Sequence, residues 1–432
     1  MRQLRQELDH QLTKRRQGSL LFRNFFPWPV KQLVRLPKGV TNIEDVPTAT
    51  DGNQSYALVA VPALGSATYT TCDTLPTANA NKTVRIDGNT LHTSYYDVTC
   101  RADGVLTSIV DRQTHREWLA GQGGNVFTLY EDRPLDFDDW NIDADYPDKS
   151  RPLFAQRIEL TANNSLFADL SMDFSFGHSK MHQDVRFYAH SPRIDFITHV
   201  DWHEHQMLLR TAFNTTVRSD YARYDIQYGN VQRPTNDNTS WDQAKFETVA
   251  HKWADLSERD YGLALLNDCK YGYRIKGRQL SLTLLKSGID PDPHADEGRH
   301  QFTYSLLPHE GDFLSGDVEK VSEELNDPVQ IVTNASDDQL TAFVHLSGDF
   351  PVALDAIKLS EDKKAVIIRL HDYSGTKNVI TVEPQFHYVK VVQVKLNEQE
   401  DHHLPVPKEN HHKLQLLMHP YQIVTLRFDI SD

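Results

Sequence analysis

Most of the chain consists of short runs in which apolar and polar residues alternate, and each run ends near glycine, proline, asparagine or aspartate. Alternation with a period of two is typical of half-buried β-strands. In the middle of the chain such runs follow one another closely, at residues 167–176, 184–188, 194–202, 262–266 and 280–285. Many punctuated strands with few helical segments predict a large antiparallel sandwich, and similar runs between 340 and 432 predict a further one.

Two segments have the period of a helix instead. Leu4, Leu8 and Leu12 recur every four residues in the segment 1–16, which contains neither proline nor glycine. A helix this short is marginal on its own and needs a surface to pack against. A second helix is predicted at 317–325, where apolar residues recur at helical spacing and Asn-Asp-Pro follows.

These changes of pattern divide the chain into four parts. We expect a leading helix at residues 1–17, a small β domain at 18–85, a large β sandwich at 86–325 and a C-terminal β-sandwich at 326–432. Within the large sandwich, the Ala-Asp-Gly sequence at 102–104 predicts a hairpin turn between two strands. The predicted fold class is therefore mainly β, with a short N-terminal helix.

The composition of the chain indicates which classes of partner it is suited to bind. The chain has 432 residues, of which 39% are hydrophobic and 24% charged, as in an ordinary globular protein. A formal net charge of −15 argues against nucleic-acid binding, because that requires a basic surface. A neutral partner such as a sugar suits an acidic protein better. The N-terminus has no signal-peptide pattern and no run long enough to span a membrane, so we expect a cytoplasmic protein without a membrane partner.

Cysteine usage agrees with a reducing compartment. Cys72, Cys100 and Cys269 are far apart and form no C-x-x-C pair. Their odd number and wide spacing match neither a zinc ribbon nor a redox pair. We expect three free, buried thiols with no role in catalysis.

An acidic segment at 130–146, YEDRPLDFDDWNIDADY, is the first candidate for chemistry because it carries seven carboxylates among aromatic residues. Its spacing does not match a calcium loop of the EF-hand type, since the position that requires glycine is Asn141. A catalytic pair of carboxylates, as in glycosidases, is an alternative that the sequence leaves open. Tyr130, Trp140 and Tyr146 favour a surface that faces sugar.

A histidine-rich segment at 198–205, THVDWHEH, is the second candidate. In a strand, His199, Asp201, His203 and His205 would share one face and could supply the ligands of a zinc site. The competing interpretation is a half-exposed strand that runs into a turn, with histidines satisfied by hydrogen bonds, and we favour it. The pair His182 and Asp184 has the same spacing and the same interpretation.

Five stretches together resemble the C-terminal, β-rich half of glycoside hydrolase family 38 α-mannosidases of the bacterial and cytosolic–vacuolar type. They are YEDRPLDFDDWNID (130–143), DWHEHQMLLRTAF (201–213), YGNVQRPTNDNTSWDQAKFE (228–247), HKWADLSERDYGLALLNDCKYGY (251–273) and LSLTLLKSGIDPDPHADEGRHQFTYSLLPHEG (280–311). The resemblance runs from about residue 18 to the C-terminus, and the motifs are specific as a set.

The resemblance implies a galactose-mutarotase-like super-sandwich flanked by smaller β-sandwich domains, with residues 1–17 as the last helix of a helical bundle. In that family a separate N-terminal barrel holds the zinc ion and the aspartate nucleophile, and hydrolysis of α-mannosides retains configuration. The zinc motifs of the barrel have no counterpart in this sequence. We therefore expect no catalytic residue and no metal ligand in this chain, and a catalytic barrel in the same or an adjacent polypeptide as its partner.

The resemblance also assigns roles to residues of the acidic segment. Trp140, Asn141 and Asp143 are the candidates for substrate contact, in a loop that reaches toward the sugar pocket of the barrel. The residues expected to support them are Tyr130, Glu131 and Asp132. Outside the segment, Arg233 and Asn238 are expected to hold a loop between strands.

Three functions follow as alternatives. The chain either completes the carbohydrate site of an α-mannosidase that serves mannose metabolism, or binds mannosides as a stand-alone carbohydrate-binding module, or is an inactive remnant. Zinc is expected only in the intact family enzyme. A homo-oligomer is also expected, because family members associate through their β halves.

Overall fold

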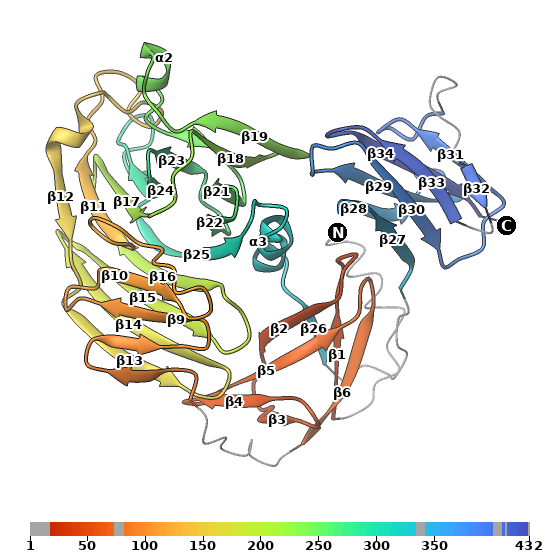
Figure 1. The fold of residues 1–432 in the computed structure, drawn as a ribbon, viewed down its shortest axis with the longest axis horizontal. Helices are drawn as coiled ribbons and strands as arrows, with labels where there is room; N and C mark the ends of the chain where they lie inside the picture. Colours follow the sequence, from red (N-terminus) through yellow and green to blue (C-terminus); the bar gives the residue numbers. More distant parts are fainter. Residues whose placement is uncertain (1–17, 73–81, 334–341, 401–407, 411–412, 431–432) are drawn as a thin grey trace. The chain divides into compact units, whose positions relative to one another are not determined.

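The computed structural model describes residues 18–72, 82–333, 342–400, 408–410 and 413–430. Nearly all of its regular structure is antiparallel β, which confirms the predicted mainly β sandwich class (Figure 1). Within the described ranges the α-helices are α2 (Ser240–Gln243) and α3 (Val318–Asn326), and α3 lies where a helix was predicted. The helix predicted at 1–16 lies outside the described residues.

The chain divides into two compact units, which are described separately. One unit comprises residues 78–226 and 231–327, and the other comprises 1–77, 227–230 and 328–432. In the described parts of both, no helix has the length and apolar character needed to cross a membrane.

Three sheets build the first unit. A six-stranded sheet has the order β12 (Ser150–Leu153), β11 (Val126–Glu131), β17 (Met207–Asn214), β24 (Gln279–Ser287), β23 (Gly272–Lys276) and β20 (Thr248–Val249). A nine-stranded sheet has the order β13 (Arg157–Asn163), β14 (Phe167–Phe176), β15 (Ser179–Tyr188), β16 (Ile194–Trp202), β25 (Gly298–Glu310), β22 (Tyr261–Asn267), β21 (Trp253–Ser257), β18 (Tyr221–Ile226) and β19 (Gly229–Pro234). The third has the order β10 (Leu106–Asp111), β9 (Tyr96–Cys100), β8 (Thr90–His92) and β7 (Arg85–Asp87).

The hairpin predicted at 102–104 joins β9 and β10. Gly104 has a φ of +91°, a conformation that glycine adopts without a steric cost, and its amide donates to the Arg101 carbonyl at 3.0 Å. The Asp103 carboxylate accepts the Val105 amide at 3.3 Å. The Asp-Gly pair therefore sets this turn as the sequence predicted.

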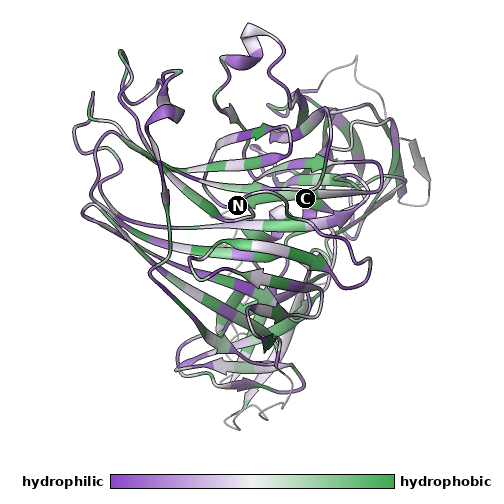
Figure 2. Ribbon diagram, turned by 60° about the vertical axis from the view of Figure 1, so that its left-hand side comes forward, coloured by the Kyte–Doolittle hydropathy of each residue, from purple (hydrophilic) through white to green (hydrophobic). Residues whose placement is uncertain are grey.

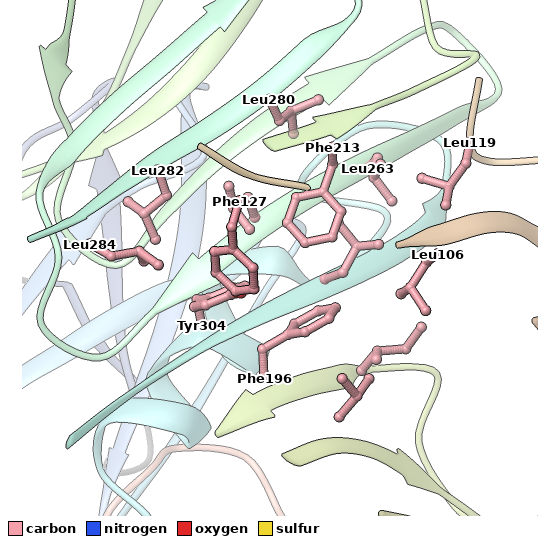
Figure 3. Close-up of a cluster of buried hydrophobic side chains, with 14 of the residues drawn as sticks. Leu106, Leu119, Phe127, Phe196, Phe213, Leu263, Leu280, Leu282, Leu284 and Tyr304 are labelled. Atoms are coloured by element: carbon pink, nitrogen blue, oxygen red, sulfur yellow. The ribbon is translucent and has the colours of Figure 1, made fainter. Parts of the chain in front are cut away.

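The core of the first unit lies between the six-stranded and nine-stranded sheets. Phe127 and Phe213 project from β11 and β17, and they meet Phe196 and Tyr304 from β16 and β25 (Figure 3). The Phe196 and Tyr304 rings stack with centroids 4.9 Å apart. Burial of each such ring contributes roughly 1.5–3 kcal/mol, and Figure 2 shows the alternation of hydrophobic and hydrophilic residues that directs one face of each strand inward.

The second unit contains four small sheets. Its first part has β26 (Gln330–Thr333), β1 (Ser19–Arg23), β6 (Ser66–Cys72) and β3 (Asn42–Ile43) in one sheet, and β2 (Val30–Arg35), β5 (Gln54–Val61) and β4 (Thr48–Asp51) in another. Its second part has β27 (Val344–Gly348), β30 (Asn378–Pro384), β33 (Lys413–Met418) and β32 (Lys408–Asn410) in one sheet, and β28 (Val352–Leu359), β29 (Ala365–Asp372), β34 (Ile423–Asp429) and β31 (Lys390–Val394) in another. Each part has its own hydrophobic core.

Cys72, Cys100 and Cys269 form no disulfide bond, but the prediction that all three are buried was wrong. Cys72 and Cys100 are half-buried at the ends of strands, and Cys269 is exposed in the turn between β22 and β23. A cysteine in a turn lacks a second layer of structure to cover it. Burial and the neighbouring Asp268 raise the pKa of the Cys269 thiol to about 11, so it is protonated at neutral pH.

Candidate functional site

The acidic segment forms a loop at one end of the six-stranded sheet. It leaves β11 at Glu131, and we call residues 132–146 the acidic loop. The amide of Asp132 donates to the Gln206 carbonyl at 2.8 Å, immediately before β17 begins. The loop returns through a 3-10 turn at Tyr146–Lys149 into β12. Three adjacent strands therefore fix where the loop starts and ends.

Lys286, at the end of β24, lies beneath the first half of the acidic loop. Its ammonium group donates to the Asp132 carboxylate and, at 2.7 Å, to the Asp138 carbonyl. Asp132 is only 2% exposed, and burial raises the pKa of its carboxyl above the usual value although the Lys286 charge acts in the opposite direction. The Asp138 carboxylate accepts the Ile289 amide at 2.5 Å. One lysine thus ties two points of the loop to the sheet.

Gly288 allows the loop to lie directly against the segment that follows β24. A Cβ atom added at Gly288 would stand 1.9 Å from the Asp139 Oδ1 atom and 3.2 Å from the Asp138 carbonyl carbon. The Asp139 amide also donates to the Asp290 carbonyl at 3.3 Å. A larger residue at 288 would first have to displace the Asp139 side chain, and the Asp138 backbone is the next contact.

Arg210 on β17 holds the other end of the loop. Its guanidinium group donates to the Tyr146 hydroxyl at 2.9 Å and to the Glu247 carboxylate, and it lies 5.4 Å from the ring centre of Tyr130. Burial lowers the pKa of the Arg210 guanidinium, but the interactions with Glu247 and Tyr146 raise it by more. The pKa therefore lies above its ordinary value. The arginine therefore stays charged, and it gathers three side chains at the base of the loop.

The loop closes on itself through the polar residues that were predicted to touch substrate. The Asn141 side-chain amide donates to the Asp136 carbonyl at 2.9 Å, and the Asp143 carboxylate accepts the Leu135 amide at 2.9 Å. Trp140 is 68% exposed, and its neighbours Leu135 and Phe137 are 88% and 67% exposed. The structure thus gives Asn141 and Asp143 a part in shaping the loop, and Trp140 is one of three large hydrophobic side chains exposed on it.

The three predicted supporting residues occupy different positions. Asp132 is buried on Lys286, and the Tyr130 ring lies 5.1 Å from the ring of Tyr146. Glu131 lies 3.5 Å from the Arg133 guanidinium at the surface. Asp132 and Tyr130 therefore face the anchors beneath the loop, whereas Glu131 does not.

Sequence reasoning missed the two cationic anchors, Lys286 and Arg210. Each is a single charge within an apolar strand, in LSLTLLKS and MLLRTAFN. A lone cation in a buried strand needs an acceptor, which is Asp132 for Lys286 and Glu247 for Arg210. For the predicted loop holders, the Arg233 guanidinium lies over the Tyr224 ring at 4.6 Å, and the Asn238 amide donates to the Asn236 side chain at 3.3 Å.

In the histidine-rich segment and in the pair His182 and Asp184, histidines lie against carboxylates. His203 hydrogen-bonds to Asp201 at 3.1 Å, and His182 lies between Asp173 at 2.7 Å and Asp184 at 3.3 Å. Asp184 raises the pKa of His182 to about 9, so the ring is an imidazolium in an ion pair and not a neutral metal ligand. In the described ranges, including the acidic loop, no group of three or more His, Cys, Asp or Glu side chains could hold a metal ion.

Two sequence profiles identify the family. The glycosyl hydrolases family 38 C-terminal domain matches residues 91–294, and the C-terminal beta sandwich domain of that family matches residues 351–426. The chain belongs to glycosyl hydrolase family 38. The acidic loop lies inside the first match, as does the Lys286 anchor beneath it.

Two curated members of the family match 94% and 70% of the chain. Human alpha-mannosidase 2C1 is 34% identical over 423 residues, which span 94% of this chain and 39% of the relative. Alpha-mannosidase G of Dictyostelium discoideum is 32% identical over 70% of this chain and 28% of its own length. The chain thus spans about two fifths or less of the length of these relatives.

Solved structures of the family share the fold. The crystal structure of an alpha-mannosidase from Enterococcus faecalis V583 matches 99% of this chain and 59% of that protein, with a TM-score of 0.79. A second family 38 protein from Enterococcus faecalis matches with a TM-score of 0.77. Sequence identity is 13% and 14%, so these likenesses establish the architecture only.

Proposed function

We propose that this chain completes and supports the carbohydrate site of a family 38 α-mannosidase. The observation that carries the proposal is the acidic loop, which the buried Arg210 and the half-buried Lys286 hold in one shape while Trp140 is exposed on it. The family and the names of its curated relatives support an α-mannoside as substrate. Retaining, zinc-dependent hydrolysis would require the catalytic barrel as partner, since none of the donor groups described above fits zinc.

Each part of the loop has a distinct task in this proposal. The flat face of the Trp140 indole packs on the C–H groups of a mannose ring, while Asn141 and Asp143 keep the indole in place and offer their remaining polar atoms to sugar hydroxyls. Leu135 and Phe137, which are 88% and 67% exposed, form an apolar rim beside Trp140 that suits contact with the barrel. Because Lys286 and Arg210 fix the loop beforehand, little conformational freedom is lost when sugar binds.

The proposal is tested in a protein that joins this chain to the barrel of a related α-mannosidase. Trp140→Ala should raise the KM for an aryl α-mannoside about tenfold, which corresponds to about 1.4 kcal/mol of lost sugar contact. The matched control is Tyr221→Ala, because Tyr221 is another exposed aromatic residue, at 57%, outside the loop. Equal KM values for Trp140→Ala and the control would contradict the proposal.

A second candidate function is a carbohydrate-binding module that acts without the barrel, and the exposed, pre-ordered Trp140 favours it. In that case the purified chain binds methyl α-mannoside in calorimetry and loses the binding in Trp140→Ala. Binding that appears only after the barrel is joined would support the first candidate instead. An inactive remnant would show neither binding nor restored hydrolysis.

A further inference from the structure

A second projecting element stands beside the acidic loop. Residues 235–247, which we call the second arm, connect β19 to β20 and carry helix α2. Trp241 in α2 is 81% exposed. All residues of the second arm are described, and Trp241 is the sole large hydrophobic residue exposed on it.

The second arm is held in shape by its own polar groups. The Thr239 hydroxyl accepts the Asp242 amide at 3.1 Å and donates to the Asp242 carboxylate at 2.6 Å, which caps α2. Lys276 on β23 lies beneath the arm, pairs with the Asp237 carboxylate and donates to the Asp242 carbonyl at 3.3 Å. Since these bonds already order the arm, the exposed indole is not needed for its stability.

The two elements share one base. The Phe246 ring at the end of the second arm lies 5.8 Å from the ring of Tyr146, in an edge-to-face arrangement. Glu247 pairs with Arg210, the same residue that holds Tyr146. Figure 1 accordingly shows α2 near the end of the six-stranded sheet where β11 and β12 meet the acidic loop. Arg210 is thus a common anchor for the segments that carry Trp140 and Trp241.

We propose that the second arm is a carbohydrate-contacting element, in which Trp241 packs on a second sugar of an oligosaccharide whose first sugar lies on Trp140. The ligand class is an α-mannoside of two or more linked hexoses. This inference rests on the proposed function of the acidic loop and extends it to a longer substrate.

The surroundings of Trp241 favour a sugar over a protein partner. The core of a protein interface needs several adjacent apolar side chains, whereas the second arm exposes one indole among Asn238, Ser240 and Asp242. A single aromatic face within a polar rim matches a hexose, which has an apolar C–H face and hydroxyl groups at its edge. The shared base at Arg210 joins the ends of the two segments that carry the indoles, so one oligosaccharide can contact both.

The test compares a short and a long ligand on the purified chain. Methyl α-mannoside and a linear α-mannotriose are titrated by calorimetry into the native chain and into Trp241→Ala, Trp140→Ala and the control Tyr221→Ala. The native chain should bind the trisaccharide at least tenfold more tightly than the monosaccharide. Trp241→Ala should lose that difference, and Trp241→Phe, which keeps an aromatic face, should retain part of it. Trp140→Ala should weaken both ligands, and the control should change neither.

The outcomes separate this inference from the proposed function. Unchanged trisaccharide binding in Trp241→Ala, with monosaccharide binding preserved, would overturn the role of the second arm alone. If the native chain alone binds neither sugar, the same variants are titrated in the protein joined to a family 38 barrel, where failure to bind either sugar would overturn sugar contact by the acidic loop, and the inference with it. As a control, amide hydrogen exchange across 235–247 is compared between each variant and the native chain. Equal exchange rates show that the second arm stays folded, so that a loss of binding is due to the missing indole.

Discussion

Replacing Lys286 by methionine removes the ammonium group that holds the acidic loop to β24 while preserving much of the side-chain volume. The Asp132 carboxyl, 2% exposed, would then lie buried without its cation. Removal of one partner from a buried ion pair costs about 3–5 kcal/mol. The carboxyl can instead take up a proton and become neutral. The free energy of that protonation is therefore an upper limit on the stability that the substitution removes.

This upper limit on the stability loss depends on pH, and it is calculated from the ordinary pKa of an aspartate, about 3.9. Protonation at pH 7 costs about 4 kcal/mol, because each pH unit above that pKa is worth about 1.4 kcal/mol, and at pH 5 it costs about 1.5 kcal/mol. In the variant the pKa of Asp132 in the folded state lies further above its unfolded value. A carboxyl whose pKa is raised in the folded state lowers the stability of that state as pH rises above the unfolded pKa. The variant therefore loses more stability, relative to the native chain, at pH 7 than at pH 5.

Urea unfolding at pH 5 and pH 7 measures this effect. We expect Lys286→Met to lose about 3–4 kcal/mol at pH 7 and about 1.5 kcal/mol or less at pH 5. The double variant Lys286→Met/Asp132→Asn should recover much of the loss at pH 7, because residue 132 then carries no charge. The control Lys180→Met, at an exposed lysine, should change stability by no more than about 0.5 kcal/mol. Equal losses at the two pH values, or a loss below about 1 kcal/mol at pH 7, would refute the reasoning.

Two further predictions concern other parts of the first unit. Glu319 in α3 is buried, and its carboxyl group accepts the Trp253 indole N–H at 2.7 Å. Burial raises the pKa of Glu319 to about 8, and the negative charge of Asp225 adds to this effect. Its stabilising effect is therefore lost as pH rises through about 8, and Glu319→Gln should flatten the fall in Tm measured between pH 6 and 9, whereas an unchanged slope would contradict this assignment. Gly288→Ala should lower Tm and speed amide exchange across 132–146, because the added Cβ would meet Asp139 at 1.9 Å; an unaltered exchange pattern would show that the loop does not depend on that contact.

The sequence predicted the class of the fold because strand periodicity and turn residues are local properties. The hairpin at Asp103-Gly104 and helix α3 illustrate this, since each is specified within about ten residues. The pairing of β26 with β1 was not predicted: alternation marks a strand, but it does not name a partner some 300 positions away. Burial of the cysteines was likewise misjudged, because it depends on what the rest of the fold places above each residue.

The sequence predicted where the site lies better than it predicted what each residue of the site does. Carboxylates and aromatic residues within 130–146 identified the acidic loop, and the resemblance to family 38 named Trp140. The roles of Lys286 and Arg210 depend on contacts across more than sixty positions of sequence, which no local pattern encodes. The hydrogen bonds that Asn141 and Asp143 use to close the loop also follow from its three-dimensional course, so the sequence did not distinguish closing residues from projecting ones.

The most direct test of the central claim is hydrolysis of an aryl α-mannoside by the purified chain alone and by the chain joined to a family 38 barrel, each with added zinc and with chelator. The account predicts no turnover by the chain alone and zinc-dependent turnover by the joined protein. Zinc-dependent turnover by the chain alone would contradict it, and would direct attention back to the face that carries His199, Asp201 and His203.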